Sequence, residues 1–360
     1  MSKREKVLVA LSGGVDSAVA AALLVEQGHE VHAAYMKNWI NEVNVLGHCP
    51  WEEDVRDATA VAATLGIPFE IVNLMDAYKS RIVEYLLKGY QDGVTPNPDA
   101  MCNREIKFGV FLEHALANGF EAVATGHYAR RRTNDDGTAD ILEGLDPNKD
   151  QTYFLALMRQ EQAFRARFPV GHLLKPEVRE TARRFGLPVA EKKDSQGICF
   201  IGEVKMSDFL RAFVPDKPGR IVTPDGKKVG MHKGLHLYTL GQGKGLGLAS
   251  NTYREKYVVV EKRVATNELV VAFDRPDSPG LWTSRSEVVS ITWVNRPLSG
   301  PADILARPRY RAPSAALRFE PVDATRALLT WREPQRAIAP GQICAFYDGD
   351  VLLGGGVFVS

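Results

Sequence analysis

The chain has 360 residues, more than one hydrophobic core usually organises, so two or three domains are expected. Hydrophobic residues make up 45% of it and charged residues 25%, proportions that exclude a disordered chain. The net charge of +1 excludes an overall basic character, so any surface for nucleic acid must be local.

The first half of the chain alternates short apolar runs with amphipathic stretches. The apolar runs predict buried strands at residues 7–11, 31–36, 69–74 and 122–125. Residues at helical spacing, each stretch ending near a glycine, predict helices at 17–28, 52–66 and 105–119. This order predicts an α/β fold with a doubly wound parallel sheet, whose ligands lie beyond the carboxyl ends of the strands.

The second half changes in texture. A further helical region is predicted from about residue 151 to 187, and from about 205 Pro and Gly become frequent. Alternating runs at 256–264 and 267–273 predict β-hairpins, and short strands continue to the end at the spacing of a small barrel or sandwich. We therefore expect an N-terminal α/β domain at 1–204, a central β-rich domain at 205–279 and a C-terminal β-barrel at 280–360.

The cysteine content and the hydropathy bear on the compartment. Four cysteines and an opening stretch, MSKREKVLVALSGG, without the features of a secretory leader favour a reducing cytosol. Polar residues interrupt every apolar run before the roughly 20 residues that cross a bilayer. We expect a cytoplasmic protein.

The segment ALSGGVDSA, residues 10–18, joins the first predicted strand to the first predicted helix. Such a junction is an anion site, because unpaired N–H groups and the positive end of the helix dipole face the ligand. The two glycines permit close approach to phosphate oxygens, and the two serines add hydroxyl donors. Asp16 beside phosphates would need a cation, so a nucleotide with Mg²⁺ is expected. The plainer alternative is a capped helix after a tight turn; the spacing matches neither a Walker loop nor a dinucleotide fingerprint.

The stretch SGGVDS resembles the pyrophosphate-binding loop of the ATP-pyrophosphatase superfamily, whose members cleave ATP between its α- and β-phosphates and adenylate a carbonyl oxygen. The resemblance implies a PP-loop ATPase type of N-terminal domain that binds ATP. The ATP contacts that it implies are Ala10, Leu11, Ser12, Gly13, Gly14, Val15, Asp16, Ser17, Met36 and Gly126. All of these positions fall at carboxyl ends of predicted parallel strands, where the topology places the ligand.

Two cysteines have surroundings that would favour reactivity. Cys102 follows a segment stiffened by two prolines and precedes an amphipathic helix, so its thiol would lie near a helix N-terminus, which favours the thiolate. Cys199 lies in a Gly-containing turn downstream of two lysines. The alternative is that each is a small buried hydrophobe, as we expect for Cys49 and Cys344. The spacing leaves open whether Cys102 and Cys199 meet.

Longer stretches in the same order resemble the family of bacterial tRNA-specific 2-thiouridylases, almost from end to end: TPNPDAMCNREIKFG, ATGHYAR, NKDQTYFL, DSQGICFIG and LYTLGQGKGLGL. In that family ATP adenylates the position-2 oxygen of the wobble uridine in lysine, glutamate and glutamine tRNAs, and a cysteine persulfide supplies sulfur. The resemblance implies that Cys199 carries the persulfide, that Cys102 is the nucleophile of the active-site loop and that Asp99 is an acid/base group. It also implies release of AMP and pyrophosphate, and a cysteine desulfurase or sulfur-relay protein as donor.

The same resemblance implies contacts with tRNA. The target base would meet Asn97, Pro98 and Asp99, and the other implied contacts are His127, Lys149, Asp150, Gln151, Arg309, Tyr310 and Gln342. From the residues alone, arginines at 307, 309 and 311 recur at period two and predict one basic face of a strand, suited to phosphates. A structural histidine, a polar turn and a solvated edge strand are the respective alternatives. Gly243 stands where many relatives carry a basic residue, which weakens an RNA role for that turn.

Two other classes of function stay open. A PP-loop ligase that adenylates a small metabolite would explain the loop but would leave the two cysteines and the C-terminal barrel without a role. A non-catalytic RNA-binding or sulfur-relay protein would not need the loop. No metal site is expected other than Mg²⁺ bound through ATP.

Overall fold

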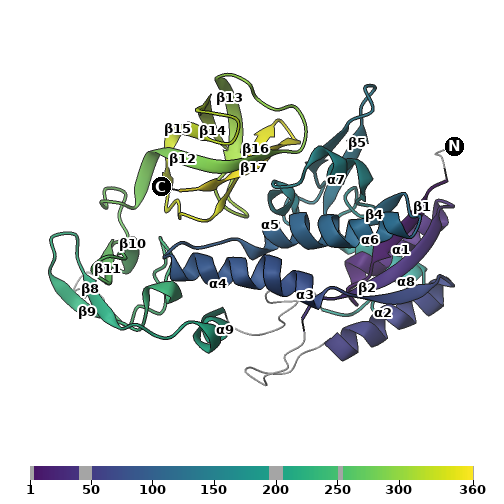
Figure 1. Ribbon diagram of the computed structural model, residues 1–360, viewed down its shortest axis with the longest axis horizontal. Helices are drawn as coiled ribbons and strands as arrows, with labels where there is room; N and C mark the ends of the chain where they lie inside the picture. The colour runs from purple at the N-terminus through teal and green to yellow at the C-terminus, as the bar shows by residue number, and fades with distance from the viewer. Residues whose placement is uncertain (1–3, 40–50, 194–205, 250–253, 360) are drawn as a thin grey trace.

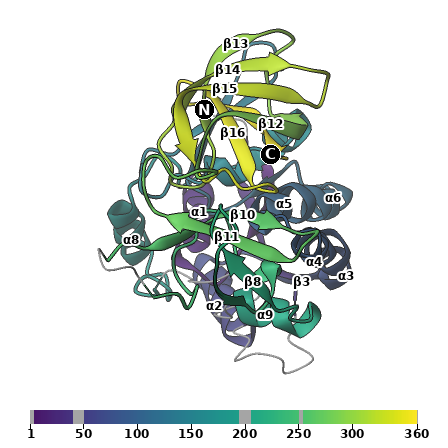
Figure 2. The same ribbon diagram turned by 90° about the vertical axis from the view of Figure 1, so that its left-hand side faces the viewer.

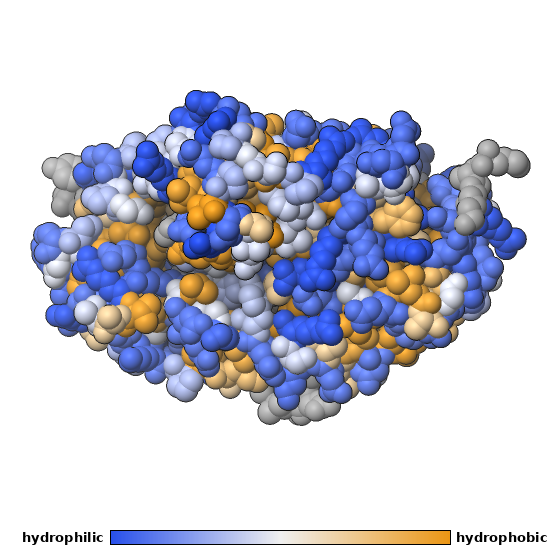
Figure 3. All heavy atoms as spheres, turned by 45° about the horizontal axis from the view of Figure 1, so that its top comes forward, coloured by the Kyte–Doolittle hydropathy of each residue, from blue (hydrophilic) through white to orange (hydrophobic). Residues whose placement is uncertain are grey.

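The computed structural model describes residues 4–39, 51–193, 206–249 and 254–359 (Figure 1). An α/β domain occupies one end of the long axis, and a β-barrel and a small β-rich domain lie beside each other toward the other end (Figures 1 and 2). The face drawn in Figure 3 is predominantly hydrophilic, with hydrophobic residues in separate groups. Within the described ranges no helix is both long enough and apolar enough to span a bilayer.

A parallel sheet in the order β3-β2-β1-β4-β7 forms the centre of the α/β domain. Its strands are β1 (Lys6–Ala10), β2 (Glu30–Lys37), β3 (Phe69–Asn73), β4 (Ala122–Ala124) and β7 (Ala166–Arg167). The first four confirm the predicted strands, but β3 is mostly exposed because it is an edge strand, so the prediction of burial is wrong for most of residues 69–73. Strand β7 lies inside the region predicted to be helical and was missed, because two residues are too short to produce a periodic pattern.

Helices cover both faces of this sheet, as the doubly wound prediction requires. Val7 and Val9 pack against α1 (Val15–Glu26), α2 (Trp51–Leu65) and α8 (Lys175–Arg184). Leu8 and Ala10, which point the opposite way along β1, pack on the second helical layer. This layer consists of α3 (Met75–Tyr78), the π-helix η1 (Lys79–Val83), α4 (Glu84–Gln91), α5 (Pro98–Cys102), the π-helix η2 (Asn103–Val110) and α6 (Phe111–Ala117).

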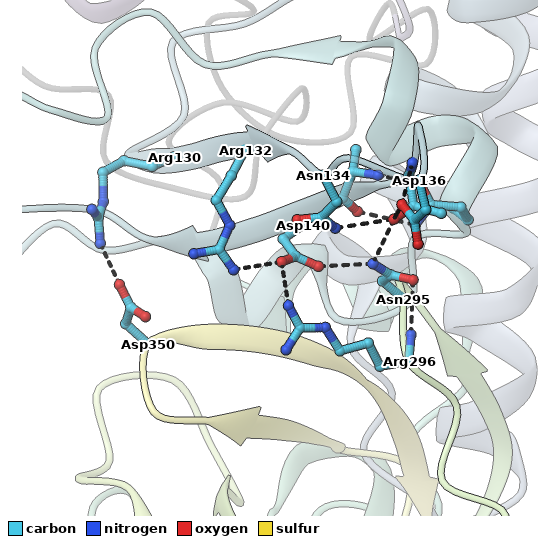
Figure 4. A network of polar contacts seen from close by, with 11 residues as sticks. Arg130, Arg132, Asn134, Asp136, Asp140, Asn295, Arg296 and Asp350 are labelled. Carbon is cyan, nitrogen blue, oxygen red and sulfur yellow. Dashed lines mark hydrogen bonds and ion pairs between the residues drawn. The ribbon is translucent and has the colours of Figure 1, made fainter.

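A hairpin made of β5 (Ala129–Thr133) and β6 (Ala139–Glu143) leaves the α/β domain and joins the C-terminal sheet through β17. The buried carboxylate of Asp140 accepts hydrogen bonds from Arg132 at 2.6 Å, Asn295 at 2.8 Å and Arg296 at 2.7 Å (Figure 4). Although burial opposes it, these partners hold the pKa of Asp140 below its usual value. The hairpin therefore ties two domains together through a paired buried charge. Downstream lie a 3₁₀ turn, η3 (Thr152–Leu155), and α7 (Gln160–Arg165).

The C-terminal domain is a closed six-stranded barrel, which confirms the prediction of a barrel. Its sheet runs β12-β15-β14-β13-β16-β17, and pairing of β12 with β17 closes it. The strands are β12 (Trp282–Trp293), β13 (Ala302–Arg307), β14 (Ala315–Pro321), β15 (Ala327–Arg336), β16 (Ile343–Asp348) and β17 (Val351–Phe358). Aromatic residues such as Phe319 and Phe346 fill its interior.

The central domain is a four-stranded sheet in the order β10-β11-β8-β9. Its elements are α9 (Met206–Phe213), β8 (Gly219–Val222), β9 (Lys228–His232), the 3₁₀ turn η4 (Leu235–Leu237), β10 (Tyr257–Arg263) and β11 (Glu268–Phe273). The antiparallel pair β10 and β11 confirms the predicted hairpin. An ion pair of 2.8 Å between Asp274 and Arg336 links this domain to the barrel.

Two buried histidines should make the fold sensitive to acid. In the central domain, Nδ1 of His232 and Nε2 of His236 are buried without a hydrogen-bond partner. Burial lowers the pKa of both imidazoles, and the charge of Asp216 compensates only in part for His236. The unfolded chain therefore binds protons first as pH falls through about 6.5, and the free energy of unfolding decreases below that pH.

The measurement is the thermal unfolding midpoint between about pH 8 and pH 5. It should fall with acid in the native chain and fall less in His236→Gln. His114→Gln, at a partly exposed site on α6, is the control and should follow the native profile. A midpoint of the native chain that does not change over this range would contradict the expectation.

Candidate active site

The loop between β1 and α1 is the predicted anion site, and the structure shows how its residues are held. Gly13 has φ of +75°, and a Cβ there would lie 2.7 Å from the carbonyl oxygen of Asp54, so only glycine fits. The Ser17 hydroxyl accepts a hydrogen bond from the Ser12 N–H at 3.1 Å and donates one to the Gly14 carbonyl at 3.0 Å. These contacts fold the loop around the first turn of α1 and fix the direction of its N–H groups.

Asp16 is held by two residues that sequence reasoning missed. Its Oδ1 accepts hydrogen bonds from the Tyr128 hydroxyl at 2.8 Å and from Lys175 Nζ at 2.7 Å. Tyr128 follows the ATG stretch at the end of β4, and Lys175 is the first residue of α8, 159 positions after Asp16. No local pattern marks this lysine. Asp16 itself presents the hard oxygen ligands that Mg²⁺ prefers, so the loop fits a magnesium-bound phosphate chain.

The other two residues expected at the nucleotide lie within or just after the two strands that flank β1. Gly126 follows β4, and a Cβ there would lie 2.6 Å from the backbone nitrogen of Ser17. Met36 lies near the end of β2 and is buried. The structure therefore brings the loop and both of these residues to the carboxyl edge of the sheet.

The segment that contains Cys102 starts a helix earlier than expected. The Asn97 side chain caps α5 by accepting a hydrogen bond from the Ala100 N–H at 3.1 Å, and Pro98 occupies the first turn. Helix α5 therefore begins at Pro98, so Cys102 lies one turn inside the helix and does not precede it, which corrects the expected position. Its side chain is 3% exposed and packs in the same cluster as Ala10 and Met36.

A π-helix follows Cys102 directly. Gly109 in η2 departs from helical backbone angles, and the side-chain amide of Gln162 donates to the carbonyls of Arg104 and Phe108, both at 2.8 Å. Gln162 thereby supplies a donor to two carbonyls of the wide turn. π-Helical turns are frequent at functional sites. Gln162 thus helps to fix the shape of the helix that follows Cys102.

The charge of Lys107 acts on the pKa values of both Asp99 and His127. Burial raises the pKa of Asp99, and the charge of Lys107 opposes the shift. Burial and the same lysine lower the pKa of His127 well below its usual value. Its Nδ1 lies 2.7 Å from the Thr125 hydroxyl, and its ring contacts that of Phe108. The pair offers a carboxyl group that gains a proton more readily than usual and a neutral imidazole.

Both β domains touch the segment that precedes Asn97. Gln342 donates from its side-chain amide to the Thr95 carbonyl at 2.8 Å, and the Thr95 N–H donates to the Pro340 carbonyl at 2.8 Å. The Thr95 and Thr239 hydroxyls lie 3.2 Å apart. Gln342, expected from the family resemblance to contact tRNA, therefore lies where the barrel contacts the segment that leads to Cys102.

The stretch from Lys149 to Gln151 is not merely a polar turn. The buried Asp150 carboxylate accepts hydrogen bonds from Arg307 at 2.7 Å and from the Gly144 N–H at 2.9 Å. Gln151 accepts from the Tyr128 N–H at 3.0 Å, next to the tyrosine side chain that holds Asp16. Lys149, which precedes both of these residues in sequence, is partly buried.

The prediction that three arginines share one strand face is wrong. Strand β13 ends at Arg307, because Pro308 has no N–H to donate, and the following residues turn. Arg307 binds Glu143 and Asp150 internally, whereas Arg309 and Arg311 are exposed. The turn and the loop at 143–150 line an open pocket of about 570 Å³, whose wall includes Tyr310 and Arg311 and also Glu143 and Asp150.

Of the other three cysteines, Cys344 alone lies within the described residues. Cys199 and Cys49 lie outside the described residues. Cys344 is buried in the barrel, which confirms the expectation of a small buried hydrophobe, and burial raises the pKa of its thiol well above the usual value.

An anion loop with an internal aspartate, at the carboxyl edge of a doubly wound sheet and followed by two β domains, defines an ATP-pyrophosphatase type of α/β protein. Three family models match in order: a tRNA methyl transferase HUP domain at residues 5–203, a tRNA methyl transferase PRC-barrel domain at 207–273 and an aminomethyltransferase beta-barrel domain at 285–358.

Curated relatives align with nearly the whole chain. It is 57% identical to the tRNA-specific 2-thiouridylase MnmA of Akkermansia muciniphila over 99% of both chains. It is 45% identical to the protein of the same name from Pseudomonas fluorescens, over 99% of this chain and 95% of that one. The chain belongs to the family of tRNA-specific 2-thiouridylases.

Proposed function

We propose that this protein uses ATP to replace the position-2 oxygen of the wobble uridine in tRNA with sulfur. The observation that supports the proposal is that the loop lies at the carboxyl edge of the sheet, while Cys102 packs in the hydrophobic cluster on the face of the sheet to which Ala10 and Met36 contribute. ATP bound to this loop would activate the uridine by adenylation, and the thiol of Cys102 on α5 would take part in sulfur transfer to the same base. We assign this chemistry to the domain at 1–204, and tRNA contacts also to the domain at 280–360.

The first step is adenylation. The loop from Ser12 to Ser17 would bind the phosphates, Met36 would border the adenine and Gly126 would let the backbone approach. Uridine O2 would attack the α-phosphorus of ATP, and the bond to pyrophosphate would break with its electron pair leaving on pyrophosphate. Mg²⁺ held by Asp16 would neutralise phosphate charge when bound.

The second step is sulfur transfer. A persulfide on Cys199 would attack C2 with its terminal sulfur, and the C2–O bond would break to release AMP. The Cys102 thiolate would then attack Cys199 Sγ, so that the S–S bond of the persulfide breaks and the thiolated base leaves. The resulting Cys102–Cys199 disulfide requires Cα atoms within roughly 7 Å and an external thiol to reduce it before the next turnover.

The residues around Cys102 suit a flipped base. Asn97, Pro98 and Asp99 would meet it, and the raised pKa of Asp99 suits proton exchange with the pyrimidine ring. A base in an anticodon loop is partly unstacked, which lowers the cost of flipping. His127, Lys149, Asp150 and Gln151 would contact or support the neighbouring nucleotides, with Arg309 and Tyr310 on the barrel and Gln342 at the domain contact.

Two observations weigh against the alternative, a PP-loop ligase for a small metabolite. The barrel contacts the active-site segment through Gln342 and Thr95, which gives that domain a place in the site. The pocket between the 143–150 loop and the turn after β13 also offers an aromatic and an exposed arginine to a polyanion. The sulfur donor is proposed to be a cysteine desulfurase acting directly or through a relay protein.

The test is mass spectrometry of nucleosides after incubation with bulk tRNA, ATP, Mg²⁺ and a persulfide source. We expect 2-thiouridine derivatives at the wobble position only when ATP is present. Pyrophosphate release that proceeds without tRNA, with no thiolated nucleoside, would favour the small-metabolite ligase.

Affinity for tRNA should fall steeply with salt, because binding of phosphates by cationic side chains releases counterions. Replacing Arg309 and Arg311 with Gln should make the slope of log affinity against log salt shallower by about 0.7 to 0.9 for each phosphate that the variant no longer neutralises. Arg332→Gln is the matched control, because Arg332 is an exposed barrel arginine paired with Asp303. A salt profile that is flat for the native protein would contradict the electrostatic account.

A further inference from the structure

The lysine that the anion loop lacks in sequence is supplied from a distant helix. Lys175 Nζ lies 2.7 Å from Asp16 Oδ1, and the side chain is only 13% exposed. The same ammonium lies 5.9 Å from the centre of the Tyr128 ring. A lysine therefore reaches the first turn of α1, where backbone N–H groups point toward the anion site.

The surroundings direct Lys175 toward the loop. Its backbone N–H donates to Asp146 Oδ2 at 3.0 Å, which fixes the first residue of α8. Val178 and Ala182 of α8 pack in the cluster that also contains most of α1, so the two helices keep a fixed relation. The packing of the two helices thus positions the ammonium of Lys175. A lysine on the open surface would lack this constraint.

The charge at the loop calls for such a cation. A triphosphate brings several negative charges to a loop whose own ionisable side chain, Asp16, is negative. Backbone dipoles offset only part of this repulsion. During adenylation, negative charge moves to the departing pyrophosphate, which increases the need for a cation beside it. A preorganised cation would stabilise that charge more than water does.

We propose that Lys175 is the cation that binds the β- and γ-phosphates of ATP and remains with pyrophosphate as the bond to the α-phosphorus breaks. Asp16 holds the ammonium in place in the nucleotide-free molecule and gives it up to the phosphates. In this step the bond from uridine O2 to the α-phosphorus forms, the bond from that phosphorus to the bridging oxygen breaks, and the electron pair stays on pyrophosphate. Lys175 keeps its proton throughout. The inference rests on the proposed function for the identity of the attacking oxygen.

The experiment measures binding of ATP, inorganic pyrophosphate and AMP to the full chain by calorimetry. Lys175→Met should weaken ATP and pyrophosphate binding by about tenfold or more, because it removes a charge-assisted hydrogen bond to phosphate, and should leave AMP binding unchanged. Lys175→Arg should recover part of the affinity. With saturating tRNA, Lys175→Met should also lower kcat, since the interaction strengthens as pyrophosphate leaves.

The matched control is Arg184→Met. Arg184 lies on the same helix and pairs with Glu26 of α1 at 2.7 Å, at an exposed site far along α8 from Lys175. It should leave the affinity for all three ligands unchanged. If Lys175→Met lowers only the thermal unfolding midpoint and keeps pyrophosphate affinity within about twofold of the native value, the ion pair is structural and the inference is wrong. A native protein that binds ATP through Lys175 yet produces no thiolated tRNA would instead overturn the proposed function alone.

Discussion

Cys102→Ser is expected to abolish thiolation of tRNA while ATP binding stays at the native level. A serine hydroxyl cannot displace sulfur from a persulfide, because it is neither a thiolate nor able to form the disulfide that releases the product. ATP binding should survive because the loop contacts belong to Ser12, Ser17 and Asp16, none of which Cys102 fixes. Nucleoside mass spectrometry measures the first quantity and calorimetry with ATP the second.

Two further cysteine variants, Cys344→Ala and Cys199→Ser, serve as comparisons for Cys102→Ser. Cys344→Ala, which changes a cysteine buried in the barrel, should keep thiolation and cost no more than about 1–2 kcal/mol of stability. Cys199→Ser should also abolish thiolation, but Cys102→Ser and Cys199→Ser should differ when the donor carries labelled sulfur. Cys102→Ser should retain protein-bound label and Cys199→Ser should not. Full thiolation in Cys102→Ser would exclude the mechanism.

The parts of the fold that are local in sequence could be predicted from it. Strand β1 alternates Val and Leu in a run that is buried from Val7 to Ala10, and the loop that follows carries its glycines, serines and aspartate within nine residues. Such patterns predict local structure, because strand periodicity and helix termini depend on residues that are neighbours in sequence. The four predicted parallel strands and the loop after β1 accordingly lie where they were expected.

The contacts between distant segments could not be predicted in the same way. Lys175 reaches Asp16 across 159 positions, and β6 pairs with β17 across most of the chain. The hairpin of β5 and β6 also contains a buried carboxylate, Asp140, which hydropathy alone would place at the surface. These features follow from tertiary packing, which cannot be predicted from the local patterns of one sequence.

One error was avoidable. The arginines at 307, 309 and 311 have the period of a strand, but Pro308 lies between the first two, and proline within such a run argues against a continuous strand. The structure ends β13 at Arg307 and uses that arginine internally, on Glu143 and Asp150. The exposed arginines that follow, Arg309 and Arg311, are therefore presented by a turn.

Gly126→Ala is expected to remove ATP binding and to destabilise the α/β domain by about 1–3 kcal/mol. A Cβ at this position would lie 2.6 Å from the Ser17 nitrogen and 2.7 Å from the Asp16 carbonyl carbon. Both neighbours are backbone atoms of the first turn of α1, so relief of the clash requires that this turn move. Calorimetry with ATP and denaturant unfolding measure the two effects.

Movement of that turn would have a larger effect on binding than on stability, which is what separates this glycine from an ordinary packing position. The N–H groups of the loop would no longer converge on the phosphates, and Asp16 would leave the reach of Tyr128 and Lys175, whose hydrogen bonds are 2.8 and 2.7 Å long. Gly300→Ala is the control, because a Cβ there meets nothing within 4 Å. Native ATP affinity in Gly126→Ala would mean that the end of β4 does not set the geometry of the loop, and that the anion site needs only its own residues. Loss of affinity without unfolding would show instead that this loop is shaped from outside, by β4 and α8, and that its six-residue motif is incomplete without them.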